Sequence, residues 1–96
     1  MATLFVLSHA PASDPVESHR LSFAREGDAA ILIEDAVYAA APGGAAPSVV
    51  EEAQSRGMDV FALEPDLLAR GIETDLKTVD YAGFAELLAA YDRAVH

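Results

Sequence analysis

The sequence has no cysteine among its 96 residues. A chain without thiols forms no disulfide, binds no zinc through thiolates and offers no cysteine nucleophile. The three histidines, His9, His19 and His96, lack the spacing of a metal-binding motif, so we expect neither a metal nor a cofactor. No dinucleotide-binding GxGxxG motif and no phosphate-binding GxxxxGK[ST] motif is present.

Basic residues are also scarce, because six Lys and Arg stand against 16 Asp and Glu and give a net charge of −10. Binding to nucleic acid relies on basic patches that neutralise phosphates, so direct nucleic-acid binding is disfavoured, as is an anionic membrane surface. No apolar run approaches membrane-spanning length, and the first residues lack the basic and long apolar regions of a signal peptide. We therefore expect a cytoplasmic protein whose acidic surface favours solubility.

The chain does contain short apolar runs of the kind that form buried strands. The most prominent one opens AAILIEDAVYAAA and predicts a strand over roughly Ala29–Glu34, with two carboxylates at its carboxyl end. The alternation and β-forming residues of Thr3–Leu7, Met58–Leu63 and Leu76–Val79 predict three further strands.

Helix signals separate these strands. Asp and Pro residues that favour helix starts, and glycines that favour helix ends, recur between the apolar runs. We expect helices from Pro15 to Glu26, from a cap at Asp35 through Tyr38, from Pro47 to about Arg56, after Glu64-Pro65, and after a cap at Asp80. The last helix carries an apolar stripe of Phe84, Leu87, Leu88, Tyr91 and Val95.

Strands that alternate with helices imply right-handed crossovers and a parallel sheet covered on both faces. The sequence therefore predicts an α/β fold. We expect residues 1–96 to form one small three-layer α/β/α domain with a mainly parallel sheet of about four strands. A domain of this size with extra apolar surface often completes itself by forming an oligomer.

Glu34 and Asp35 are the most prominent candidate pair for chemistry. Adjacent residues that leave a strand usually point in different directions, so they rarely act on one substrate. The favoured interpretation is a helix cap at Asp35 beside a solvated Glu34, and the alternative is an acidic site at an interface.

Ser8 and His9 also follow a strand and suggest nucleophilic catalysis. Sequence neighbours seldom form the required hydrogen bond, and no GxSxG motif is present. Loop residues with a structural hydrogen bond are the favoured interpretation. Tyr38 and Tyr81 are ordinary packing residues on this evidence, and Phe84 is a core or subunit-interface residue.

Three segments resemble one family in their order along nearly the whole chain. LFVLSHAP near the start, FAREGDAAILIEDAVYAA in the middle and VDYAGFAELL near the end are similar to the TusB/DsrH family of sulfur-relay subunits. The resemblance implies a DsrE/F/H-like α/β fold and a heterohexamer with TusC/TusD-like (DsrE/DsrF-like) subunits. It also implies contact, through that complex, with TusA- and TusE-like carriers that pass persulfide sulfur toward 2-thiolation of the wobble uridine in tRNA.

The sequence departs from the DsrH pattern where that family carries a cysteine in its first helix. Arg20 occupies this position, or His19 if the register slips by one residue. The chain therefore has no thiol to hold a persulfide, which favours a TusB-like subunit without catalytic residues. One hypothesis places the Arg20 guanidinium near a partner's thiolate, where it would lower the thiol pKa, and the favoured alternative is a solvated arginine.

The resemblance turns the carboxylate pair from a candidate active site into scaffold and subunit contact. The candidate interface residues are Glu34, Asp35, Val37, Tyr38, Tyr81 and Phe84. Other functions stay open: a DsrH-like subunit in dissimilatory sulfur oxidation, a stand-alone homo-oligomeric binding module, or a small hydrolase that uses Glu34, Asp35 or His9.

Overall fold

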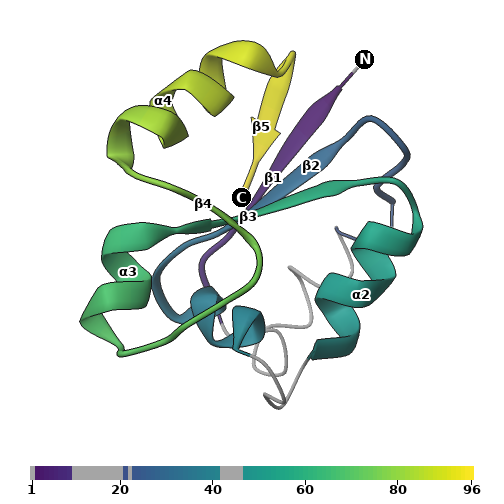
Figure 1. Ribbon diagram of the computed structural model, residues 1–96. Coiled ribbons are helices and arrows are strands. Elements are labelled where there is room, and N and C mark those ends of the chain that lie inside the picture. Colours follow the sequence, from purple (N-terminus) through teal and green to yellow (C-terminus); the bar gives the residue numbers. More distant parts are fainter. Residues whose placement is uncertain (1, 10–20, 22, 42–46) are drawn as a thin grey trace.

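The computed structural model describes residues 2–9, 21, 23–41 and 47–96. They form a five-stranded sheet in which every pair of neighbouring strands is parallel, in the order β4-β3-β2-β1-β5 (Figure 1). The strands are β1 (Thr3–Leu7), β2 (Ala29–Leu32), β3 (Asp59–Leu63), β4 (Lys77–Val79) and β5 (Arg93–Val95). The predicted α/β class with a parallel sheet is confirmed.

Four helical segments of the described part connect these strands. They are the 3-10 helix η1 (Glu34–Ala40) and the α-helices α2 (Pro47–Ser55), α3 (Glu64–Ala69) and α4 (Tyr81–Ala90). The predicted starts at Pro47, Glu64 and Asp80 are confirmed. Asp80 caps α4 through its Oδ1, which accepts a hydrogen bond from Gly83 N at 2.8 Å. None of the helices in the described ranges is long and apolar enough to cross a membrane.

The strand order decides how the two faces of the sheet are covered. From β1 to β4 each step moves to the next strand in one direction, so right-handed crossovers place their connections on one face. The step from β4 to β5 returns across the sheet and therefore places α4 on the opposite face (Figure 1). The result is a three-layer domain with unequal outer layers.

The buried side chains divide in the same way. On the first face, alternate strand residues such as Phe5, Leu32 and Val60 pack with residues from η1, α2 and α3 into the larger core. On the second face, the described residues form a smaller buried cluster of Leu4, Val6, Ala29 and Ile31, and the partly buried residues against it include Phe84 and Leu87 of α4. Both faces obey the two-residue period of a strand.

The chain end differs from the prediction. The apolar stripe was expected to continue to Val95 as helix, but α4 ends at Ala90 and Arg93–Val95 forms a fifth strand beside β1. The backbone of Asp92 donates to Ala2 O at 3.0 Å, while Ala2 N donates to Asp92 Oδ2 at 2.7 Å. This pairing with the start of the chain overrides the local helical pattern.

The helix expected from Pro15 to Glu26 lies mostly outside the described residues. Its described end is wrong, because residues 23–26 form turns and irregular backbone. The Asp28 carboxylate accepts a hydrogen bond from Arg25 N at 2.9 Å and draws the chain into a turn. Phe23, expected on the apolar face, is 69% exposed.

Candidate functional site

A polar cluster lies where β2 and β3 end, at the carboxyl edge of the sheet. The chain leaves β2 through Ile33, whose N–H still donates to Leu7 O of β1 at 2.9 Å. Glu34 then adopts a left-handed backbone with φ +49°, which is uncommon for a residue other than glycine. Its N–H donates to Asp66 Oδ2 on α3 at 2.6 Å, and this bond holds the turn into η1.

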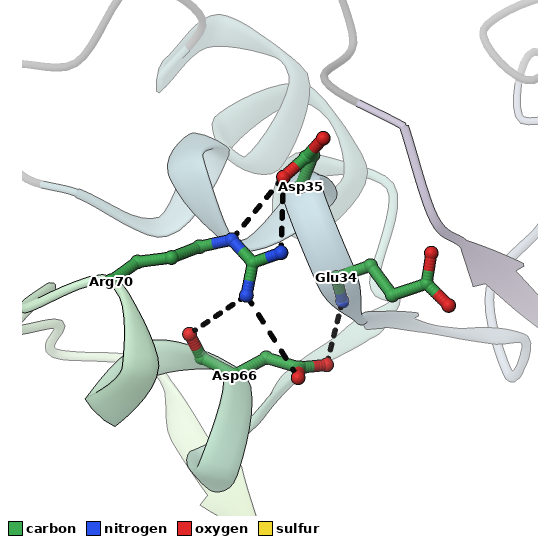
Figure 2. Close-up of polar contacts among 4 residues, drawn as sticks. All are labelled: Glu34, Asp35, Asp66 and Arg70. Carbon is green, nitrogen blue, oxygen red and sulfur yellow. Dashed lines mark hydrogen bonds and ion pairs between the residues drawn. The ribbon is translucent and has the colours of Figure 1, made fainter.

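Arg70, at the carboxyl end of α3, joins α3 to η1. Its Nε and Nη2 both donate to Asp35 Oδ1, at 3.2 and 3.0 Å, and its Nη1 donates to the backbone oxygen of Asp66 at 3.3 Å (Figure 2). The guanidinium carbon also lies 5.9 Å from the centre of the Tyr38 ring, within the range of a cation–π contact. Figure 2 shows the Glu34 side chain pointing away from this cluster, while Asp35 points into it.

The charges of the cluster compensate one another, because Arg70 pairs with both Asp35 and Asp66. The hydrogen bonds that Arg70 donates to Asp35 are the main reason why the pKa of Arg70 is raised. Desolvation opposes this rise, and the charges of Asp35, Asp66 and Tyr38 add to it. The guanidinium thus stays charged and donates its hydrogen bonds to Asp35 and Asp66 of its own chain. The side chain of Asp35 is 66% exposed, so water screens the pair strongly. In the described ranges no group of three or more His, Cys, Asp or Glu could hold a metal ion.

The structure corrects the role predicted for Asp35. The residue that caps η1 is Ile33, without a side-chain cap, and Asp35 lies in the first turn of η1 and pairs with Arg70. Sequence reasoning placed no role on Asp66 or Arg70. Two features of the sequence could have indicated them. Asp66 and Arg70 are four residues apart on a predicted helix, and that helix follows a parallel strand whose carboxyl end lies at the same edge of the sheet as Glu34 and Asp35.

The other predicted site residues lie in separate places. Ser8 Oγ lies 3.3 Å from His9 Nδ1 in the loop after β1, so these sequence neighbours do make the contact that was expected to be rare. Tyr38 is 50% exposed in η1, and Tyr81 is 64% exposed at the start of α4 on the opposite side of the sheet. Phe84 is half-buried on the side of α4 that faces the sheet.

Val37 is fully buried in the larger core, so its side chain offers no surface to a partner. Glu34 and Asp35 are both exposed. Arg20 and His19 lie outside the described residues. The structure therefore gathers Glu34, Asp35 and Tyr38 at one edge and leaves Tyr81 on the other face.

Asp66 is expected to contribute more than Asp35 to the stability of this edge. Replacing Asp66 with Ala removes the acceptor of Glu34 N–H and should lower the free energy of unfolding by about 1–2 kcal/mol, measured by urea denaturation. Asp35→Ala should cost less than Asp66→Ala because the ion pair it breaks is exposed. Glu34→Gln, which removes an exposed charge and leaves the backbone bond, serves as control. A larger loss for Asp35→Ala would contradict this assignment.

Three comparisons place the chain among known proteins. A family model described as "DsrH like protein" matches residues 9–94. Protein TusB of Enterobacter sp. (strain 638) is 33% identical over 86 residues, which cover 88% of this chain and 86% of that protein. Protein TusB of Escherichia coli O81 (strain ED1a) is 36% identical over 66 residues, 65% of this chain and 66% of its own length, so this alignment spans just under two thirds of the relative.

The fold has a solved counterpart. The solution NMR structure of protein Tm0979 from Thermotoga maritima matches with a TM-score of 0.62 and 26% sequence identity, covering 94% of this chain and 93% of that one. The match extends over nearly the full length of both chains, and it supports the small α/β architecture independently of the sequence pattern.

Proposed function

The chain belongs to the DsrH-like family, and from that membership we propose that it is a non-catalytic subunit of a sulfur-relay complex. The observation that carries the proposal is the family match over residues 9–94 in a sequence that has no cysteine. A relay step through persulfide needs a thiolate, so a subunit without one serves by completing the complex around a partner's cysteine. Asp35 and Arg70 are paired with each other, which agrees with a structural rather than a catalytic role for this cluster.

The pathway we propose is the transfer of persulfide sulfur toward 2-thiolation of the wobble uridine in tRNA. The TusB relatives from Enterobacter and Escherichia coli support this pathway over dissimilatory sulfur oxidation. The partners in this proposal are TusC/TusD-like (DsrE/DsrF-like) subunits in a heterohexamer. In this proposal TusA- and TusE-like carriers bind the complex, and sulfur transfer takes place in the cytoplasm.

Complementation tests the pathway directly. In a bacterial strain that lacks its own TusB, expression of this chain together with its two partner subunits should restore 2-thiouridine in tRNA, measured by mass spectrometry of nucleosides. Expression of the partner subunits without this chain is the control. Recovery of the complete complex without 2-thiouridine would reject tRNA thiolation and favour the sulfur-oxidation alternative. A stable homo-oligomer that binds neither subunit would reject the relay function itself.

Arg20 offers a finer test within the same assay. If its guanidinium lies near the partner's thiolate, Arg20→Ala should raise the thiol pKa, and each unit of pKa would lower the thiolate fraction about tenfold at a pH well below that pKa. Sulfur transfer by the reconstituted complex would then fall and recover at higher pH. Unchanged transfer would identify Arg20 as a solvated residue.

A further inference from the structure

Helix α4 exposes several apolar side chains on its outer side, in addition to those that it packs on the sheet. Its ten residues, YAGFAELLAA, include one charged side chain, Glu86, and none of the ten is buried. The inner side packs Phe84 and Leu87 against the sheet. The outer side exposes Tyr81, Ala82, Ala85, Leu88 and Ala89, with Tyr81 64% and Leu88 45% exposed.

The spacing of these exposed residues makes them one continuous surface. Tyr81, Ala85 and Leu88 follow at intervals of four and three residues, so they line one side of the helix, with Ala82 and Ala89 beside them. Glu86 is also exposed and borders this surface, because it lies four residues after Ala82 and three before Ala89. We call the five apolar residues the outer α4 face.

Helix α2, on the opposite face of the sheet, shows the ordinary pattern. Its buried residues are Val50 and Ala53, while Glu51, Glu52 and Gln54 are exposed. The exposed residues described in α2 are thus polar. Helix α3 exposes one large apolar side chain, Leu68, whereas α4 exposes two, Tyr81 and Leu88, with three exposed alanines beside them.

The sheet beneath α4 is also incompletely covered. A helix with its side chains is about 10–12 Å across, whereas five strands span roughly 19 Å from the first to the last. Around the four buried residues of this face, Ile33, Phe61 and Val79 stay only partly buried. The second outer layer thus leaves apolar strand residues partly uncovered by α4, with Lys77 Nζ 5.8 Å from the centre of the Phe61 ring.

Charge indicates what kind of partner would cover this surface. Exposed Asp80, Glu86 and Asp92 lie at the start, middle and end of α4. A second copy would bring another chain of net charge −10, with the same acids around its own α4. Like charges at an interface oppose association, so a partner with basic residues around an apolar centre fits better.

We infer that the outer α4 face is the docking surface for a different protein chain, which presents an apolar centre bordered by Lys and Arg. This inference rests on the proposed function, because the sulfur-relay complex supplies unlike subunits as partners. The Asp35–Arg70 edge is on the other side of the molecule from this surface and stays free for other contacts.

The test uses Leu88→Glu and Ala85→Glu in the full chain, with Gln54→Glu on the exposed side of α2 as the matched control. Each is mixed with the two purified partner subunits of the proposed complex, and affinity is measured by calorimetry. Both α4 variants should bind roughly 100-fold more weakly, because they place a charge in an apolar contact. The control should bind like the unchanged chain. Affinity of the unchanged chain should also fall as salt rises.

The outcomes separate this inference from the proposed function. Unaltered binding by Ala85→Glu, with its thermal unfolding midpoint retained, would overturn the docking surface while leaving the relay function intact. No binding by the unchanged chain would overturn the relay function, and the docking inference with it. A homo-oligomer that Ala85→Glu dissociates would overturn the choice of an unlike partner. Ala85 is exposed and has a small side chain, so this variant stays informative if Leu88→Glu fails to fold.

Discussion

Asp28→Ala is expected to destabilise the protein by about 3 kcal/mol, although it removes one negative charge from a chain of net charge −10. The carboxylate is buried at the start of β2, with 9% of the residue exposed. Its Oδ1 accepts from Thr3 N and its Oδ2 from Arg25 N, both at 2.9 Å. Alanine would leave Thr3 N, in a residue only 6% exposed, without this acceptor.

Charge alone predicts the opposite sign for this substitution. Relief of self-repulsion in an acidic protein should stabilise the compact state, and Asp59→Ala offers a matched case in which an exposed acid is removed at the start of β3. We expect Asp28→Ala to lower the thermal midpoint by roughly 10–20 °C and Asp59→Ala to change it by only a few degrees. Asp28→Asn keeps one acceptor and should fall between them. A rise in the midpoint for Asp28→Ala would show that the two hydrogen bonds contribute little.

The strands show how much of the fold local pattern determines. The runs at Thr3–Leu7 and Met58–Leu63 are apolar enough on their own to predict β1 and β3 within a residue. Arg93–Val95 has no such signal, because it is only three residues long and follows a strongly helical segment. Its apolar side chains are one valine and one small alanine. It becomes a strand through its register with β1, a partner about 90 residues earlier in the chain. Non-local pairing of this kind leaves no mark in a short window of sequence.

The candidate site divides in the same way. The sequence places Glu34 and Asp35 at the carboxyl end of a buried strand, and the structure confirms this position. It also suggests a cap for Asp35, since local helix starts favour acids. The actual partner is Arg70, 35 residues later, which reaches Asp35 only because β2 and β3 are neighbours in the sheet. The location was therefore predictable and the partner was not.

The uneven cover of the sheet joins the fold to the proposed function. Strand order places the connections of β2 through β4 on one face and, among the helices that the structure describes, places α4 on the other. The larger core with η1, α2 and α3 supplies most of the buried area. The thinner layer is where a partner can add apolar contacts without reorganising the domain. The same topology that fixes the sheet thus exposes the outer α4 face.

Gly83→Ala tests how closely α4 packs on the end of β4. Helix propensity predicts a gain of about 1 kcal/mol for this change, because glycine is a poor helix former. The structure predicts a loss. A Cβ at position 83 would lie 2.9 Å from Val79 Cβ and 3.3 Å from Val79 Cγ1. The Val79 Cβ is fixed to the backbone, so no rotamer change relieves the contact, and α4 must shift away from β4.

We expect Gly83→Ala to lower the free energy of unfolding by about 2 kcal/mol, measured by urea denaturation. Ala85→Gly, on the exposed side of the same helix, measures the propensity difference without the contact and should cost about 1 kcal/mol. Removing the opposing Cβ with Val79→Gly gives a double-mutant cycle in which the combined loss is smaller than the sum of the two single losses. If the losses from Gly83→Ala and Val79→Gly simply add, the cost of Gly83→Ala does not come from its contact with Val79. An increase in stability for Gly83→Ala alone would show that α4 moves freely, and glycine would then be a weakness of the helix rather than a condition of its docking.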